Sequence, residues 1–208
     1  MAKTKTTPSF PRLNRVFPYL LIVCSIIALI CSFVLSQDEL EIAKNPNFAP
    51  SCNLNPVLSC GSVIRTHQAA LFGFPNPWIG LAAFSVFLTV GVALLSGAQL
   101  KRWFWLMMEA GLGLAMVFAY WLLAQSVYII GALCPFCLAV DVVLTTMFWY
   151  TTLYILTNGY VTLPARLQGI VAFARKHHAE ILVTWFILLV ALILQHFWYY
   201  YGPRILGS

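Results

Sequence analysis

The sequence predicts an all-α integral membrane protein that crosses the bilayer five times. Hydrophobic residues make up 61% of the 208-residue chain and charged residues only 9%, whereas an ordinary soluble domain has roughly 25% charged residues. The apolar residues gather into runs of about 20, the length of a membrane-spanning helix. The basic residues are scattered between these runs and form no patch with interleaved aromatic side chains, so we expect no nucleic-acid partner.

The first span is predicted over Val16–Leu35. Residues 1–15, which precede it, are polar and basic and contain no acid, a pattern that also opens signal peptides. The apolar run is longer than the core of a signal peptide, and no cleavage pattern of small residues follows it. We therefore expect an uncleaved first helix after a short polar tail.

The longest polar stretch, residues 36–77, is predicted to form a loop on the membrane surface. It contains Asp38, Glu39 and Glu41 and several prolines. Its end, Gly73–Pro77, combines glycine and proline and is typical of a turn before the next helix.

Four further spans follow this loop. The second is predicted over Trp78–Leu95, and a short turn over residues 97–102 leads to the third, from Trp103 to about Leu123. The fourth begins at Cys134-Pro135-Phe136-Cys137 and runs to about Ile155. The fifth, Ile181–Tyr200, ends in an aromatic cluster of the kind found at membrane interfaces.

The positive charges predict how the chain lies in the membrane. Placing residues 1–15, 97–102 and 157–180 in the cytoplasm puts nine of the twelve Lys and Arg residues inside and three outside. Cytoplasmic segments of membrane proteins carry this excess of Lys and Arg. The loop 36–77 and the turn 124–133 then share the extracytoplasmic face.

Four cysteines are therefore predicted to meet at the oxidising surface of the membrane. Cys52 and Cys60 lie in the outer loop, and Cys134 and Cys137 lie at the start of the fourth span. Two dithiol pairs at one surface are what a disulfide relay requires, with the loop pair mobile and the helix pair fixed.

Helix capping is predicted to make two of these cysteines reactive. Pro135 suits the first helical turn and so places Cys134 at the helix cap. The unpaired N–H groups and the helix dipole favour a thiolate there, which lowers its pKa below the roughly 8.5 of a free thiol. Ser59 can cap a second, short helix in the loop and give Cys60 a similar advantage.

Other chemical roles for these and nearby residues are disfavoured. The four cysteines could hold zinc, but an oxidising compartment and uneven loop spacing argue against it, and we predict no metal site. Cys24 and Cys31, seven residues apart in the first span, are expected to be packing residues. Glu109 is expected to be structural.

Asp141 lies one helical turn beyond Cys137, within the fourth span. An ionisable residue there is expected to face the protein interior or a cavity. It could make a hydrogen bond between helices or polarise a bound carbonyl group.

Three motifs together resemble one family. They are Asn55–Val63, with seven residues between Cys52 and Cys60, then Phe72–Pro77 followed by Gly80, and Leu133–Cys137. This combination, over roughly residues 16–157, is similar to the bacterial homologues of vitamin K epoxide reductase. The resemblance implies a four-helix catalytic bundle around a quinone pocket, including the outer loop 36–77. Residues 158–208 would add a cytoplasmic connection and a fifth transmembrane helix.

The resemblance also implies a path for electrons. Cys52 would receive them through a mixed disulfide with a partner, Cys60 would attack Cys134, and Cys137 would face the quinone. The quinone would be menaquinone or ubiquinone from the membrane pool. Many bacterial members carry a fused thioredoxin-like domain, but this sequence ends at Ser208. The resemblance therefore implies a separate thioredoxin-fold, DsbA-like partner.

Three further residues acquire roles from the resemblance. Asn76 matches the position that hydrogen-bonds a quinone carbonyl. Thr66, six residues after Cys60, falls where the family carries a Ser or Thr needed for activity. Asp141 stands where the vertebrate enzymes have a tyrosine, so its contact with the second carbonyl departs from the family pattern.

The sequence thus predicts a thiol–quinone oxidoreductase of the bacterial inner or plasma membrane that supports disulfide bond formation. Reduction of vitamin K quinone or its epoxide is an alternative that shares every motif. A non-enzymatic metal-binding membrane protein is a further alternative. The four-helix disulfide-bond oxidases of enterobacteria are disfavoured because they carry the C-x-x-C pair in the first outer loop, the reverse of the order here.

Overall fold

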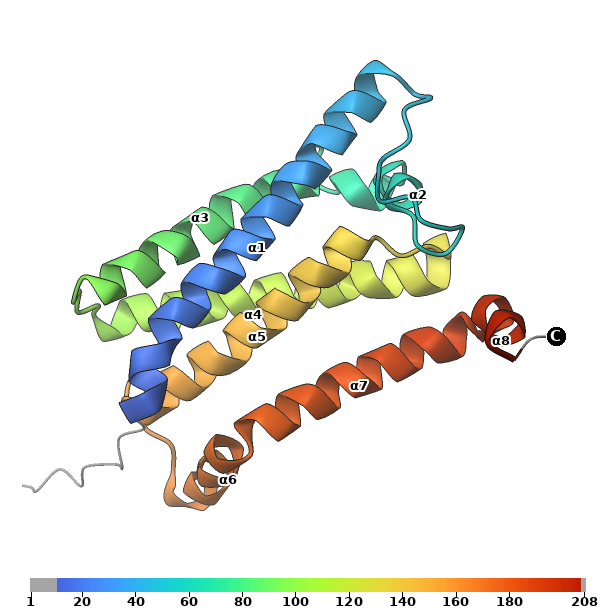
Figure 1. Ribbon diagram of the computed structural model, residues 1–208. Helices are drawn as coiled ribbons and strands as arrows, with labels where there is room; N and C mark the ends of the chain where they lie inside the picture. The colour runs from blue at the N-terminus through green and yellow to red at the C-terminus, as the bar shows by residue number, and fades with distance from the viewer. Residues whose placement is uncertain (1–10, 207–208) are drawn as a thin grey trace, which may run out of the picture.

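The protein is a bundle of membrane-length helices in a computed structural model that describes residues 11–206 (Figure 1). Regular structure in this range is helical, apart from one isolated β-bridge. Five of the described helices are long and apolar enough to cross a membrane, which confirms the predicted all-α membrane class. These are α1 (Pro11–Lys44), α3 (Asn76–Leu95), α4 (Arg102–Gln125), α5 (Pro135–Thr157) and α7 (His178–His196).

Shorter helices occupy both ends of the bundle. One end carries α2 (Cys60–Ile64), the 3₁₀-helix η1 (His67–Ala70), the π-helical turn η2 (Ser126–Ile130) and α8 (Trp198–Leu206). The helix α6 (Ala165–Lys176) lies at the opposite end, with the turn between α3 and α4 (Figure 1). The basic turn 97–102 and the basic connection before α7 thus share one end, as the charge pattern predicts.

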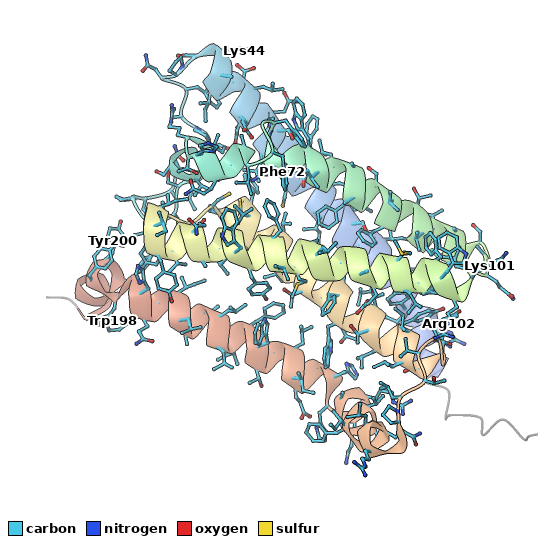
Figure 2. All side chains as sticks on the ribbon, turned by 180° about the vertical axis from the view of Figure 1, so that it is seen from behind. Lys44, Phe72, Lys101, Arg102, Trp198 and Tyr200 are labelled. Carbon is cyan, nitrogen blue, oxygen red and sulfur yellow. A yellow bond between two sulfur atoms is a disulfide. The ribbon has the colours of Figure 1, made fainter. Side chains whose placement is uncertain are left out.

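Helices α1, α3, α4 and α5 form the four-helix bundle. Helix α1 packs along α3 and α5, and α4 packs along α5. Their shared core contains the fully buried side chains Phe17, Leu21, Trp105, Leu112 and Met147. Helix α7 lies along the outside of α4 and α5 with half-buried or exposed side chains (Figure 2), and Trp185 Nε1 on it donates a hydrogen bond to Tyr120 Oη at 2.7 Å.

Glycine permits the close approach of α1 and α3. A Cβ atom on Gly91 would lie 2.7 Å from Ile22 Cγ1 and 3.2 Å from the Pro18 carbonyl oxygen. Real Cβ atoms do not approach other atoms so closely, so a larger residue would push the two helices apart. Small residues serve the same purpose in membrane helix pairs generally.

The first helix is longer than predicted. It continues beyond Leu35 to Lys44, so Asp38, Glu39 and Glu41 belong to α1 and not to the outer loop. The chain between Tyr19 and Asn45 contains neither glycine nor proline, so no residue there breaks the helix. An ion pair between Lys44 and Glu41, at 2.8 Å, stabilises its last turn.

The C-terminal region also differs from the prediction. The fifth span ends at His196, and the aromatic cluster that was assigned to its end belongs largely to α8. Phe197, between the two helices, is fully buried against Val57, Val127 and Leu133. This contact turns the chain back onto the cysteine-bearing end of the bundle. Of the predicted N-terminal tail, residues 1–10 lie outside the described residues.

Candidate functional site

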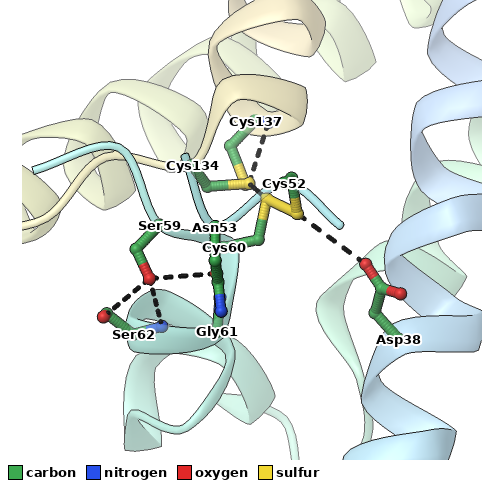
Figure 3. The surroundings of a disulfide bond; sticks show 9 residues. All are labelled: Asp38, Cys52, Asn53, Ser59, Cys60, Gly61, Ser62, Cys134 and Cys137. Carbon is green, nitrogen blue, oxygen red and sulfur yellow. Dashed lines mark hydrogen bonds between the residues drawn. A yellow bond between two sulfur atoms is a disulfide. The ribbon is translucent and has the colours of Figure 1, made fainter. Parts of the chain in front are cut away.

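The four cysteines of the two pairs meet where α2 and α5 begin. Cys52 and Cys60 form a disulfide, whereas Cys134 and Cys137 are free thiols. The Sγ atom of Cys134 lies 3.5 Å from that of Cys60 (Figure 3). The sulfur atoms of the loop pair and the helix pair are therefore in contact. Cys52, Cys60 and Cys134 are buried, and Cys137 is half-buried.

Cys134 has the environment of a stabilised thiolate. It is the N-cap of α5, followed by Pro135 at the first helical position, as predicted. Its sulfur accepts a hydrogen bond from the backbone N–H of Cys137 at 3.2 Å. The Cys137 thiol, followed by the backbone N–H groups of Cys137 and Phe136, lowers the pKa of Cys134 below its ordinary value, against the effect of burial. The thiolate is the reactive form of cysteine in disulfide exchange.

A short β-bridge aligns the two pairs. Leu58 and Leu133 form a parallel bridge, in which the Leu133 N–H donates to Val57 O at 2.7 Å and the Ser59 N–H donates to Leu133 O at 2.8 Å. The residue after Ser59 is Cys60, and the residue after Leu133 is Cys134. The bridge therefore places these two cysteines side by side although they are far apart in the sequence.

The predicted short helix in the loop is present as α2. Ser59 is its N-cap, and Ser59 Oγ accepts a hydrogen bond from the Ser62 N–H at 3.2 Å. Asn53 Oδ1 accepts two further hydrogen bonds, from the Gly61 N–H at 2.8 Å and from Ser59 Oγ at 3.0 Å (Figure 3). These bonds hold the segment around Cys52 against the start of α2.

A cavity of about 480 Å³ lies beside the Cys134–Cys137 pair, between helices α1, α3, α4 and α5. Both Cys134 and Cys137 line it. Its volume is within the range of pockets that hold small molecules, and most of its lining is apolar. The polar or ionisable residues in the lining are Ser32, Glu39, Gln68, Asn76, Ser126, Cys134, Cys137 and Asp141.

Of the three residues predicted to contact the cofactor, two line the cavity and one does not. Asn76 and Asp141 line the cavity, but Thr66 is absent from its lining. The Thr66 hydroxyl donates to Val63 O at 2.7 Å, at the end of α2. Asn76 Nδ2 donates to Gln68 O at 2.7 Å, and Asn76 Oδ1 is buried without a hydrogen-bond partner among the described residues.

Two acidic residues at the site were missed in the sequence. Glu39 lines the cavity, and its Oε2 atom is buried without a partner among the described residues. Asp38 is buried, with Oδ2 3.8 Å from Cys52 Sγ. The available signal was the helical spacing of Ser32, Leu35 and Glu39, which continues one face of α1 beyond the predicted end of the span.

Of the remaining residues considered in the sequence, Cys31 lies near Cys134 and Cys137, whereas Cys24 and Glu109 lie elsewhere in the bundle. Cys24 and Cys31 are buried free thiols on α1, and Cys24 belongs to the bundle core. Glu109 on α4 accepts a hydrogen bond from the Thr152 hydroxyl. Within residues 11–206 there is no group of three or more His, Cys, Asp or Glu side chains arranged to hold a metal ion.

The chain matches the model of a known protein family. The family model described as "Vitamin K epoxide reductase family" matches residues 19–152. This range covers most of α1 to α5, both cysteine pairs and the cavity between the four helices. No curated protein matches the chain.

Proposed function

Because the chain belongs to the vitamin K epoxide reductase family, we propose that it re-oxidises a separate thioredoxin-fold disulfide-forming protein outside the cytoplasm. The family supports a membrane oxidoreductase that passes electrons from thiols to a quinone. The observation that carries the proposal is the 3.5 Å contact between Cys60 and Cys134. It joins a disulfide in the outer loop to a thiol pair that borders an apolar cavity.

The proposed path begins at the loop disulfide. A thiolate of the reduced partner attacks Cys52, forms a mixed disulfide and releases Cys60 as a thiolate. The partner's second thiolate then attacks the partner sulfur that is bonded to Cys52. This attack releases Cys52 and leaves the partner oxidised, with a disulfide of its own. Each step is an attack of a thiolate on a disulfide sulfur. Two electrons have now entered the loop pair.

The loop pair then passes both electrons to the helix pair. The Cys60 thiolate attacks Cys134 of an oxidised Cys134–Cys137 pair and releases Cys137. Cys52 next attacks Cys60, which restores the loop disulfide and releases Cys134 as a thiolate. The arrangement in the structure, with an oxidised loop pair beside a reduced helix pair, corresponds to the end of this transfer.

The cavity residues fit a quinone. Apolar walls suit its ring and tail, and Asn76 and Asp141 offer polar groups where carbonyl oxygens would need partners. When bound, menaquinone or ubiquinone would accept two electrons and two protons. Cys137 and Cys134 border the same space, so they are the groups from which electrons would leave. We propose that Thr66 acts indirectly, because its bond to Val63 holds the end of α2, and Val63 and Ile64 line the cavity.

The redox state of the partner in cells tests the function. With Cys134→Ala or Cys137→Ala, the thioredoxin-fold partner should accumulate in its reduced form, measured by alkylation of its thiols. Cys24→Ala, in the core of the bundle, is the matched control and should leave the partner oxidised. A fully oxidised partner in the Cys134→Ala strain would contradict the proposal.

The partner itself can be captured. A Cys60→Ala variant leaves Cys52 as a lone thiol in the loop. It can form a mixed disulfide with the oxidised partner, and no Cys60 thiol remains to attack Cys52 and release the reduced partner. Mass spectrometry of the trapped complex should identify a protein of thioredoxin fold. Capture of proteins of other folds alone would contradict the partner assignment.

The family description favours one alternative, reduction of vitamin K quinone or its epoxide. Purified protein with a dithiol reductant separates the two. Quinone reduction without epoxide turnover supports disulfide formation as the function. Epoxide turnover at a comparable rate would support the alternative.

A further inference from the structure

A buried carboxyl group stands beside the loop disulfide. Asp38 Oδ2 lies 3.8 Å from Cys52 Sγ, and Asp38 is only 8% exposed. In Figure 3 the disulfide lies between Asp38 on one side and Cys134 on the other. The disulfide chemistry described above has no use for this carboxyl.

Within the part of the chain that the structure describes, Asp38 belongs to no ion pair. The ion pairs among residues 11–206 are Lys44–Glu41 and His177–Glu180. Two further charged residues of α1 and α2 have other surroundings. Arg65, at the end of α2, donates to Phe48 O at 2.9 Å, and Glu39 lines the quinone cavity. Burying a carboxyl without a cation costs stability. Its position against the sulfur atom of Cys52 therefore suggests a chemical role.

We propose that Asp38 is a catalytic base for Cys52 in the step that closes the loop disulfide. This rests on the proposed function, in which Cys60 and Cys134 are joined in a mixed disulfide before closure. The proton of the Cys52 thiol passes to the Asp38 carboxylate as Cys52 Sγ attacks Cys60 Sγ. The Cys52–Cys60 bond forms and the Cys60–Cys134 bond breaks. The electron pair of the broken bond stays on Cys134, which leaves as a thiolate.

The three sulfur atoms and the carboxyl group that take part in this step lie close together. The bond that forms is the one present, between Cys52 and Cys60. The leaving sulfur, Cys134 Sγ, is still 3.5 Å from Cys60 Sγ, and the Cys137 N–H that stabilises it is 3.2 Å away. Asp38 contacts Cys52, the sulfur that must lose its proton.

A carboxylate has two opposite effects on a neighbouring thiol, and their signs make the proposal testable. Its negative charge repels a thiolate, which slows attack at a given pH. As a base it removes the thiol proton during attack, and general bases accelerate such steps by about 10²- to 10⁴-fold. Removing the carboxyl therefore accelerates closure if charge repulsion dominates and slows it if proton removal dominates.

The test follows closure of the loop pair without a quinone. The full chain carries Cys134→Ala and Cys137→Ala, so that the only thiols left outside the loop pair are the buried Cys24 and Cys31. After reduction, it is mixed with oxidised glutathione, which supplies the oxidising equivalents. Acid quenching and mass spectrometry then give the rate at which the Cys52–Cys60 disulfide appears.

Asp38→Asn should slow closure by at least about 10-fold at about pH 6, where a free thiol with a pKa near 8.5 is almost entirely protonated. The defect should shrink above about pH 9, because hydroxide then deprotonates Cys52 without help. Asp38→Glu should restore much of the rate near pH 6. Glu41→Gln, the corresponding change of carboxyl to amide at a half-exposed position of α1, should have no effect.

Two results would overturn the proposal. A faster reaction of Asp38→Asn near pH 6 would show that the carboxylate acts only by repulsion. An equal slowing at every pH, without rescue by Asp38→Glu, would show a structural role. Asp38→Ser provides a second variant without a carboxyl if the Asn variant does not fold. Since neither a quinone nor the helix pair takes part, the result is independent of whether the chain uses a quinone.

Discussion

At the scale of residues, the proposed relay depends on the stabilisation of Cys134 as a thiolate. Its sulfur is contacted by the Cys137 thiol and by N–H groups at the start of α5, which together lower its pKa. A lowered pKa makes Cys134 a good leaving group when the loop disulfide closes. The same sulfur atom contacts Cys60 Sγ. The atom whose pKa is lowered is therefore also the atom that would exchange with the loop pair.

Cys137→Ala should raise the pKa of Cys134 towards its ordinary value, because the Cys137 thiol is the largest contribution to its lowering. In the reduced protein, the ultraviolet absorbance of the Cys134 thiolate should then appear at higher pH than in the unaltered chain. Cys24→Ala serves as the control and should leave the titration unchanged. An unchanged titration in Cys137→Ala would contradict the role assigned to that thiol.

Asn76→Ala should weaken use of the quinone. Asn76 lines the cavity, and its Oδ1 atom has no hydrogen-bond partner within residues 11–206. A lost hydrogen bond of about 1 to 1.5 kcal/mol corresponds to roughly 10-fold. The expected change is a fall in kcat/KM for quinone reduction of that size. Asn158→Ala, at the far end of the bundle where Asn158 pairs with Asn14, should retain the activity. Equal losses in both variants would argue against a contact with the quinone.

At the scale of elements, the site depends on how closely α1 lies against α3. Helix α1 supplies Asp38 to the loop disulfide and Glu39 to the cavity, and α3 supplies Asn76. Their separation is set in part by Gly91, whose missing side chain leaves room for Ile22. A change at this contact should therefore affect the bundle as a whole.

Gly91→Ala should destabilise the protein by about 1 to 3 kcal/mol, because the new Cβ would overlap Ile22 and the Pro18 carbonyl. The measurement is thermal unfolding in detergent. Gly113→Ala on α4 is a suitable control, since its Cβ would meet Phe148 at an ordinary 3.7 Å. A melting temperature for Gly91→Ala equal to that of the control would show that the helices can separate at no cost.

At the scale of the whole molecule, the two ends of the bundle differ in charge and chemistry. The turn before α4 and the helix α6 carry basic residues at one end, and both cysteine pairs lie at the other (Figure 1). The positive-inside rule predicts that the cysteine end is extracytoplasmic. Disulfide formation requires that side, because the cytoplasm keeps thiols reduced.

Labelling in intact cells tests this orientation. A cysteine introduced at the exposed Leu54, in the outer loop, should react with a membrane-impermeant maleimide. A cysteine at the exposed Ala98, in the turn between α3 and α4, should react only after the cells are opened. The reverse pattern would place the active site in the cytoplasm and contradict the proposed function.

Much of this protein could be predicted from the sequence, because the predictable features are local. Span number, the start of α5 and the cap at Cys134 follow from hydropathy, proline and neighbouring residues, and the structure agrees with each. The cap of α2 at Ser59 is likewise local. The end of α1 was misplaced because polar residues were taken to end the helix, whereas the backbone continues until Lys44.

The sequence by itself determined the membrane class, the number of spans, the two cysteine pairs and the family motifs. Only the tertiary structure decided which atoms touch. The contact between Cys60 and Cys134 depends on the bridge between Leu58 and Leu133, which are distant in the chain. The placement of Asp38 at Cys52 depends on the length of α1 and its rotation in the bundle. Such contacts arise from packing between separate helices and loops, and no local pattern of residues encodes that packing.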